Sequence, residues 1–86
     1  MYNYQTERPK LFTENGVEMV LGIKKNIQNM VAVSGAVDFY HATKGVVSAS
    51  WTQFAALDYL VEKGEIREVT NAEAMGQHKV FANPLN

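Results

Sequence analysis

The two histidines, His41 and His78, are the side chains best suited to proton transfer or metal binding near neutral pH. They lie far apart in the sequence, and neither stands in an HExxH or a related metal-binding pattern. Glu65 and Glu68 lie in one predicted strand, where carboxylates normally face solvent rather than act as an acid–base pair. The glycines fit no phosphate-binding spacing, and no serine has a nucleophile-elbow context. We therefore expect a protein that is not an enzyme and that holds no metal or cofactor.

Hydroxyl and amide side chains gather at the start of a helix that the sequence predicts over residues 50–63. Such groups bond phosphates or base edges, and the N-terminus of a helix favours a phosphate. Basic residues before this helix and in the strands after it would support the contact. The candidate nucleic-acid-binding residues are Lys44, Ser50, Thr52, Gln53, Arg67 and Lys79. The outer face of the helix nevertheless has no arginine, and Glu62 on it would repel a phosphate.

The same helix also carries large apolar side chains, which favour an alternative function. With Phe54 and Leu57 turned inward, Trp51, Ala55 and Tyr59 fall on the opposite face. Tryptophan and tyrosine are enriched at the centres of protein–protein interfaces. The alternative is therefore a protein–protein interaction module that binds its partner through Trp51, Ala55 and Tyr59.

The composition and charge of the chain bear on whether its partner is nucleic acid or protein. The chain has 86 residues, of which 47% are apolar, and this suits one small globular domain. Eight lysines and arginines stand against nine aspartates and glutamates, so the net charge is −1. Strong DNA binders show a basic excess, so this balance counts against nucleic acid. Because the sequence has no cysteine, no secretory signal and no long apolar run, we expect a cytoplasmic protein that does not enter a membrane.

The first half of the chain is predicted to form an arm and two helices. Residues 1–12 are polar and aromatic, and Pro9 disfavours helix at the residue before it, so we expect an extended arm. Thr13 is a suitable N-cap for a long helix that runs to Val33. A short second helix is expected over residues 36–43.

The second half is predicted to form one helix and two strands. Ser50 and Gln53 match the capping-box pattern S-x-x-Q, and Gly64 is the expected stop of the helix that they open. Residues 65–69 and 77–82 are expected to be the two strands of a hairpin. The predicted order is therefore a pair of helices followed by a β-hairpin.

This order, and the junction LDYLVEKGEIREV in particular, resembles the winged helix-turn-helix superfamily. The resemblance implies an α+β fold with three helices followed by a C-terminal β-hairpin wing, in a single domain over residues 13–82 with a short tail over 83–86. It also implies a DNA-binding regulatory protein, whose third helix enters the major groove of double-stranded DNA while the wing lies on the backbone. A homodimer is expected, since paired half-sites raise avidity. The chain is also similar to small proteins that bacteria and their phages encode.

Overall fold

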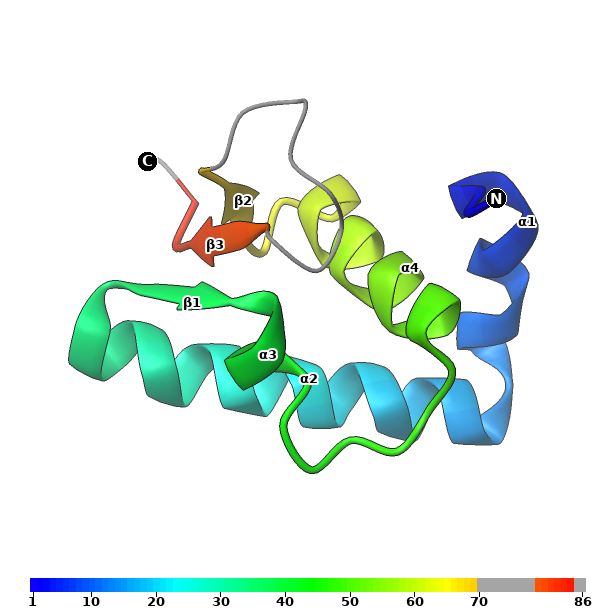
Figure 1. Cartoon of the computed structure of the whole chain (residues 1–86), viewed down its shortest axis with the longest axis horizontal. Coiled ribbons are helices and arrows are strands. Elements are labelled where there is room, and N and C mark those ends of the chain that lie inside the picture. Colours follow the sequence, from blue (N-terminus) through cyan, green and yellow to red (C-terminus); the bar gives the residue numbers. More distant parts are fainter. Residues whose placement is uncertain (70–78, 85–86) are drawn as a thin grey trace.

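The protein has an α+β fold of helices and a small antiparallel sheet, as Figure 1 shows for a computed structural model that describes residues 1–69 and 79–84. The elements are α1 (Tyr4–Glu7), the 3-10 helix η1 (Arg8–Phe12), α2 (Glu14–Ser34), β1 (Ala36–Asp38), α3 (Phe39–Ala42), α4 (Ser50–Glu62), β2 (Arg67–Glu68) and β3 (Val80–Ala82). Within the described residues, no helix is both long and apolar enough to cross a membrane.

The long helix α2 forms the base of the fold, and both of its ends follow the sequence prediction. The Oγ1 atom of Thr13 accepts a hydrogen bond from the N–H of Gly16 and so caps the first turn. At the other end, Gly35 ends the helix with a φ of 80°, a backbone conformation that glycine adopts without a steric penalty. One face of α2 is buried in the core through Met19, Ile23, Ile27 and Val31.

The sheet has the strand order β1-β3-β2, with both pairings antiparallel. Phe81 lies at its centre, opposite Val37 on one side and Glu68 on the other, and its side chain is fully buried. In Figure 1 the sheet lies above the C-terminal half of α2, beside the end of α4. The pairing of β2 with β3 agrees with the predicted strand pair, although the strands are shorter, and the loop predicted between them lies outside the described residues.

The predicted second helix over residues 36–43 is wrong in its first half, because residues 36–38 form β1. Asp38 ends the strand and caps α3, since its Oδ1 atom accepts the N–H of His41. Val37 is buried by pairing with Phe81, which is distant in sequence. Local propensity contains no information about this pairing, and for that reason the strand was missed.

The predicted extended arm is also wrong, because residues 1–12 form α1 and η1. The Oδ1 atom of Asn3 accepts the N–H of Thr6 and caps α1. Leu11 is 2% exposed and belongs to the core. Tertiary burial of this segment thus overrides the local preference for extended backbone before Pro9.

The start of α4 differs from the predicted capping box. The N-cap residue is Ala49, and no side chain caps the helix. The Nε2 atom of Gln53 instead donates to the backbone oxygen of Val46, 3.0 Å away, and so fixes the connection from α3. The predicted C-terminal end of α4 is confirmed, since Gly64 follows the helix with a φ of 73°.

The contact between η1 and α2 predicts that alanine is tolerated at one glycine of α2 and not at another. A Cβ atom at position 16 would lie 2.2 Å from the backbone oxygen of Lys10 and 2.7 Å from the Cα of Leu11. We expect Gly16→Ala to lower the free energy of unfolding by about 1–3 kcal/mol.

Gly22→Ala is the matched control, because the nearest atom to its Cβ is the Cγ2 of Val46 at an ordinary 3.5 Å. The higher helix propensity of alanine should leave this variant unchanged or stabilise it by up to about 1 kcal/mol. Urea unfolding followed by circular dichroism measures both variants. Equal effects of the two substitutions would contradict the close contact at Gly16.

Candidate functional site

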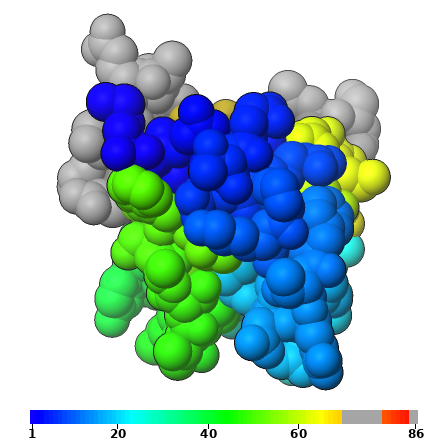
Figure 2. Space-filling model, turned by 90° about the vertical axis from the view of Figure 1, so that its right-hand side faces the viewer, coloured from blue at the N-terminus to red at the C-terminus, as the bar shows by residue number. Residues whose placement is uncertain are grey.

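The helix α4, which the sequence singled out, is packed on two sides. Ala56, Leu57 and Leu60 are buried on the side of the core. The opposite side is covered by the chain's own residues 1–12, which we call the N-terminal segment. Figure 2 shows this segment in blue, spread between the green start of α4 and its yellow end. The outer face of α4 is therefore not free in this structure.

Polar side chains hold the N-terminal segment on α4. The Tyr2 hydroxyl donates to the Oδ2 atom of Asp58 over 2.6 Å, and the Tyr4 hydroxyl donates to the Oε1 atom of Glu62 over 2.7 Å. Arg8 forms a two-pronged ion pair with the same Glu62, with Nη2···Oε2 and Nε···Oε1 distances of 2.8 and 3.1 Å. The two carboxylates of α4 thus accept hydrogen bonds from two phenols and one guanidinium.

Aromatic contacts accompany these hydrogen bonds. The ring of Tyr2 packs edge-on against Phe54 with a centroid distance of 5.5 Å, and Phe12 packs in the same manner against Tyr59. The guanidinium of Arg8 lies 5.1 Å from the ring centroid of Phe12 and 5.5 Å from that of Tyr59. These distances are typical of edge-to-face aromatic pairs and cation–π contacts.

The contacts change the proton affinities of the groups that make them. Hydrogen bonds from Arg8, and then from Tyr4, lower the pKa of Glu62 below its usual value. The partial burial of Tyr4, together with its hydrogen bond to Glu62, raises the pKa of the phenol to about 12. Burial, followed by the hydrogen bond to Asp58, raises the pKa of Tyr2 as well. Both phenols therefore stay protonated donors and Glu62 a charged acceptor at neutral pH.

The free apolar face predicted from Trp51, Ala55 and Tyr59 is not present in this form. Ala55 is fully buried, and Tyr59 is partly buried beneath Phe12 and Arg8. Trp51 alone of the three is open to solvent, with 44% of its surface exposed. The helical periodicity located these residues on one face correctly, but it carried no signal that the N-terminal segment would cover that face.

The six predicted nucleic-acid contacts lie on several elements, and three of them, Gln53, Arg67 and Lys79, are bonded within the chain. Ser50 is exposed and Thr52 is partly buried, and both lie in the first turn of α4. Gln53 is partly buried, and its Nε2 atom already donates to the backbone oxygen of Val46.

The three predicted basic contacts lie elsewhere. Arg67 donates from Nε to the backbone oxygen of Asn83. The Nζ atom of Lys79 lies 3.2 Å from a carboxylate oxygen of Glu68 and 3.9 Å from one of Asp58. Lys44 is exposed and lines a cavity together with Asn26, Asn29 and Met30 of α2.

The open surface around the start of α4 contains a cavity of about 220 Å³. Its lining includes the side chains of Lys10, Thr13, Asn15, Ser48 and Thr52, and it adjoins a groove of about 500 Å³ between α2 and residues 45–48. The lack of a side-chain cap leaves the positive end of the helix dipole open to this surface. Sequence reasoning missed Lys10, because only the folded N-terminal segment brings it to this point.

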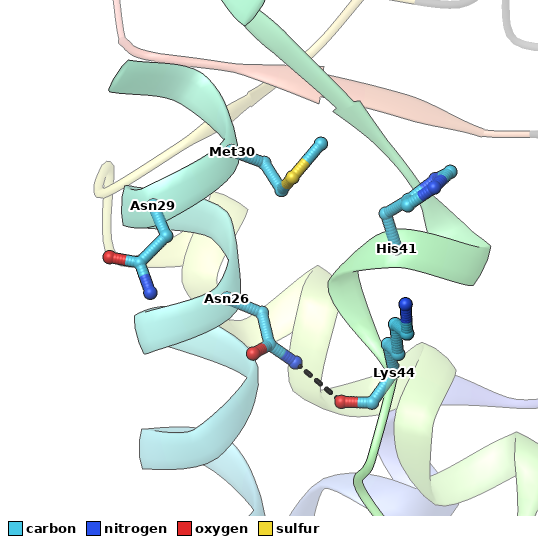
Figure 3. A pocket seen from close by; sticks show the side chains of 5 residues that line it. All are labelled: Asn26, Asn29, Met30, His41 and Lys44. Atoms are coloured by element: carbon cyan, nitrogen blue, oxygen red, sulfur yellow. Dashed lines mark hydrogen bonds between the residues drawn. The ribbon is translucent and has the colours of Figure 1, made fainter. Parts of the chain in front are cut away.

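A second cavity, of about 320 Å³, lies between α2 and α3 and is lined by Asn26, Asn29, Met30, His41 and Lys44 (Figure 3). The Nδ2 atom of Asn26 donates to the backbone oxygens of Ala42 and Lys44, so this amide holds the chain after α3 in place. His41 is bonded through Nδ1 to Asp38 at 2.7 Å. In the described part of the chain, no three histidine or carboxylate groups come together as they would to hold a metal ion.

The ion pair between Arg8 and Glu62 predicts sensitivity to acid. A carboxylate with a lowered pKa in the folded chain stabilises the fold above the usual glutamate value of about 4.3, and this contribution is lost as the pH falls through the lowered value. The stability difference between wild type and Glu62→Gln should therefore shrink as the pH falls from about 6 to about 2.

Chemical unfolding at a series of pH values measures this difference, and Arg8→Gln should reproduce the same trend. A difference that stays constant across the range would show that the ion pair does not form in solution.

Comparison with known proteins does not assign the chain: no protein-family model, no curated protein and no solved structure matches it.

Proposed function

We propose that the protein is a winged-helix-type DNA-binding accessory or regulatory protein that meets double-stranded DNA with the first turn of α4. The observation that carries the proposal is the order of elements, in which the helix pair α3 and α4 is followed directly by the antiparallel strands β2 and β3. In helix-turn-helix proteins the second helix of the pair reaches base edges with its N-terminal residues.

The first turn, rather than the whole outer face, is the part of α4 suited to this contact. Asp58 and Glu62 place two carboxylates on the outer face, where they are bonded to the N-terminal segment. Ser50 and Trp51 are exposed at the first turn, and the dipole of the uncapped helix favours a phosphate there. Hydroxyls and a helix N-terminus can bind a phosphate without an arginine-rich surface.

The charge distribution predicts weak binding that depends only moderately on salt. Arg8, Lys10, Lys24 and Lys79 are all paired with carboxylates of the same chain. Each neutralised phosphate contributes a slope of about −0.9 to the logarithm of affinity against the logarithm of salt. We expect a slope of roughly −2 to −3 per protomer, which is shallower than that of a strongly basic binder.

The fluorescence of Trp51 provides the direct test, because this single tryptophan lies in the first turn of α4 and is 44% exposed. Mixed duplex DNA is titrated into the protein at low salt and then at increasing salt. Saturable quenching that weakens with salt supports the proposal. An unchanged spectrum at low salt, where electrostatic attraction is strongest, would overturn it.

A pair of variants with equal changes of charge distinguishes the two ends of α4. Ser50→Asp adds a carboxylate at the first helical position, where the helix dipole stabilises it. It should preserve or raise thermal stability while weakening DNA binding about tenfold, because the new charge repels the phosphate.

Lys63→Gln changes the net charge by the same amount at the other end of α4, and it should alter DNA affinity much less. Anisotropy of labelled duplex and thermal unfolding measure both variants. If the two substitutions weaken binding equally, the contact is not at the first turn.

A second candidate function, binding to another protein, is favoured by exposed apolar side chains in α3, in the connection after it and at the start of α4. Tyr40 is 67% exposed and Val47 fully exposed, and Trp51 follows at the start of α4. The net charge of −1 suits a protein partner better than DNA. Under this candidate, Trp51→Ala abolishes partner binding, and duplex DNA leaves the tryptophan spectrum unchanged.

A further inference from the structure

The first eight residues contact α4 as a compact unit that is held through side chains. Backbone hydrogen bonds run within this unit, from the N–H of Glu7 to the oxygen of Asn3 and from the N–H of Arg8 to the oxygen of Tyr4. Within the unit Glu7 is 4% exposed, and its carboxylate accepts a hydrogen bond from the Nζ atom of Lys10 in η1. Further along the chain Leu11 is buried in the core, and its backbone touches Gly16. The buried apolar anchor Leu11 thus lies outside the unit that would be exchanged, although Tyr2 and Tyr4 pack against the edge of the core.

Release of this unit breaks partly exposed contacts to α4 and uncovers the buried Glu7, which is buried again when the unit docks on a second copy. The Arg8 and Glu62 side chains are 35% and 40% exposed. Ion pairs this accessible to water contribute little to stability, because solvent screens the charges and replaces the hydrogen bonds. The partly buried ring of Tyr2 against Phe54 is the main apolar contact that must separate.

The link between Arg8 and Pro9 favours the released conformation. Arg8 is helical in the docked form, with φ −51° and ψ −45°. A residue before proline prefers extended backbone, because the proline ring crowds the helical conformation. Pro9 also lacks an N–H, so opening the chain there breaks no hydrogen bond donated by that residue. An extended link would point residues 1–8 away from their own α4.

The outer face of α4 is chemically complementary to this unit. Asp58 and Glu62 supply two carboxylates, and Phe54 and Tyr59 supply aromatic rings. The unit supplies two phenols and a guanidinium at matching positions. The same unit from a second copy of the chain would find identical partners on this face.

We propose that this face of α4 is a docking site for residues 1–8 of a second copy, and that two chains exchange these residues to form a dimer. Exchange of an identical element between protomers is a low-cost route to dimers. Intramolecular docking benefits from a high effective concentration, so the exchanged dimer of the wild type forms only at high protein concentration. The proposal does not depend on DNA binding, although a dimer would present two copies of α4 to a duplex.

Charge reversal provides the decisive test. In Arg8→Glu the segment and its own α4 both carry a glutamate, and in Glu62→Arg both carry an arginine, so intramolecular docking is disfavoured in each variant. When the two variants are mixed, both intermolecular pairings join opposite charges. We expect each variant alone to be monomeric and the mixture to form a heterodimer at least about tenfold more tightly than either variant dimerises alone.

Sedimentation velocity measures the association, and circular dichroism verifies that both variants fold, as expected for partly exposed positions. The control carries Arg8→Glu and Glu62→Arg in one chain, which restores the intramolecular pair and should behave as the wild type does. A mixture that stays monomeric shows that residues 1–8 dock only within their own chain and overturns the proposal. Dimerisation of either variant alone would place the interface elsewhere and overturn it as well.

Pro9→Ala tests the link itself. Alanine permits helical backbone at Arg8, so the docked monomer becomes more favourable and dimerisation of the wild-type chain should weaken several-fold. Pro84→Ala, at an exposed position after β3, is the matched control and should leave dimerisation unchanged. Unaltered or stronger dimerisation of Pro9→Ala would count against an opened link.

Discussion

The close approach of η1 to the start of α2 is the constraint on which the rest of the structure depends. Gly16 has no side chain, so the backbone of Lys10 and Leu11 lies directly against α2. Leu11 is buried in the core at this point, and the chain before it is directed along α4. This contact sets the point from which residues 1–8 reach α4, where Tyr2, Tyr4 and Arg8 hold them.

Because the N-terminal segment packs on it, α4 differs from an amphipathic helix that has one buried and one free face. One side of the helix supports the core, and the other binds the N-terminal segment through Asp58, Tyr59 and Glu62. The first turn remains open, and it has hydroxyls and an uncapped helix end rather than a concentration of positive charge. The proposed mode of DNA binding and the proposed exchange therefore use different parts of one helix.

Several features of the fold were predictable because their causes are local. Thr13 caps α2, Gly35 ends it and Gly64 follows α4, and each of these residues acts within one helical turn. The features that were missed depend on distant partners. Residues 36–38 become a strand only because β3 lies beside them, and residues 1–12 become helical turns only because Leu11 is buried and the tyrosines reach α4.

The features of the candidate site likewise fall into those with local causes and those that depend on distant segments. The sequence by itself determined where α4 lies, that it ends before Gly64, and which residues share its outer face, because helical geometry needs only residue types and spacing. Only the tertiary structure decided which of those residues are accessible. Accessibility depends on segments that meet across the fold, such as Tyr2 and Asp58, which are 56 positions apart. The packing of distant segments, and not helical periodicity, therefore leaves Ser50 and Trp51 exposed and buries Ala55 and part of Tyr59.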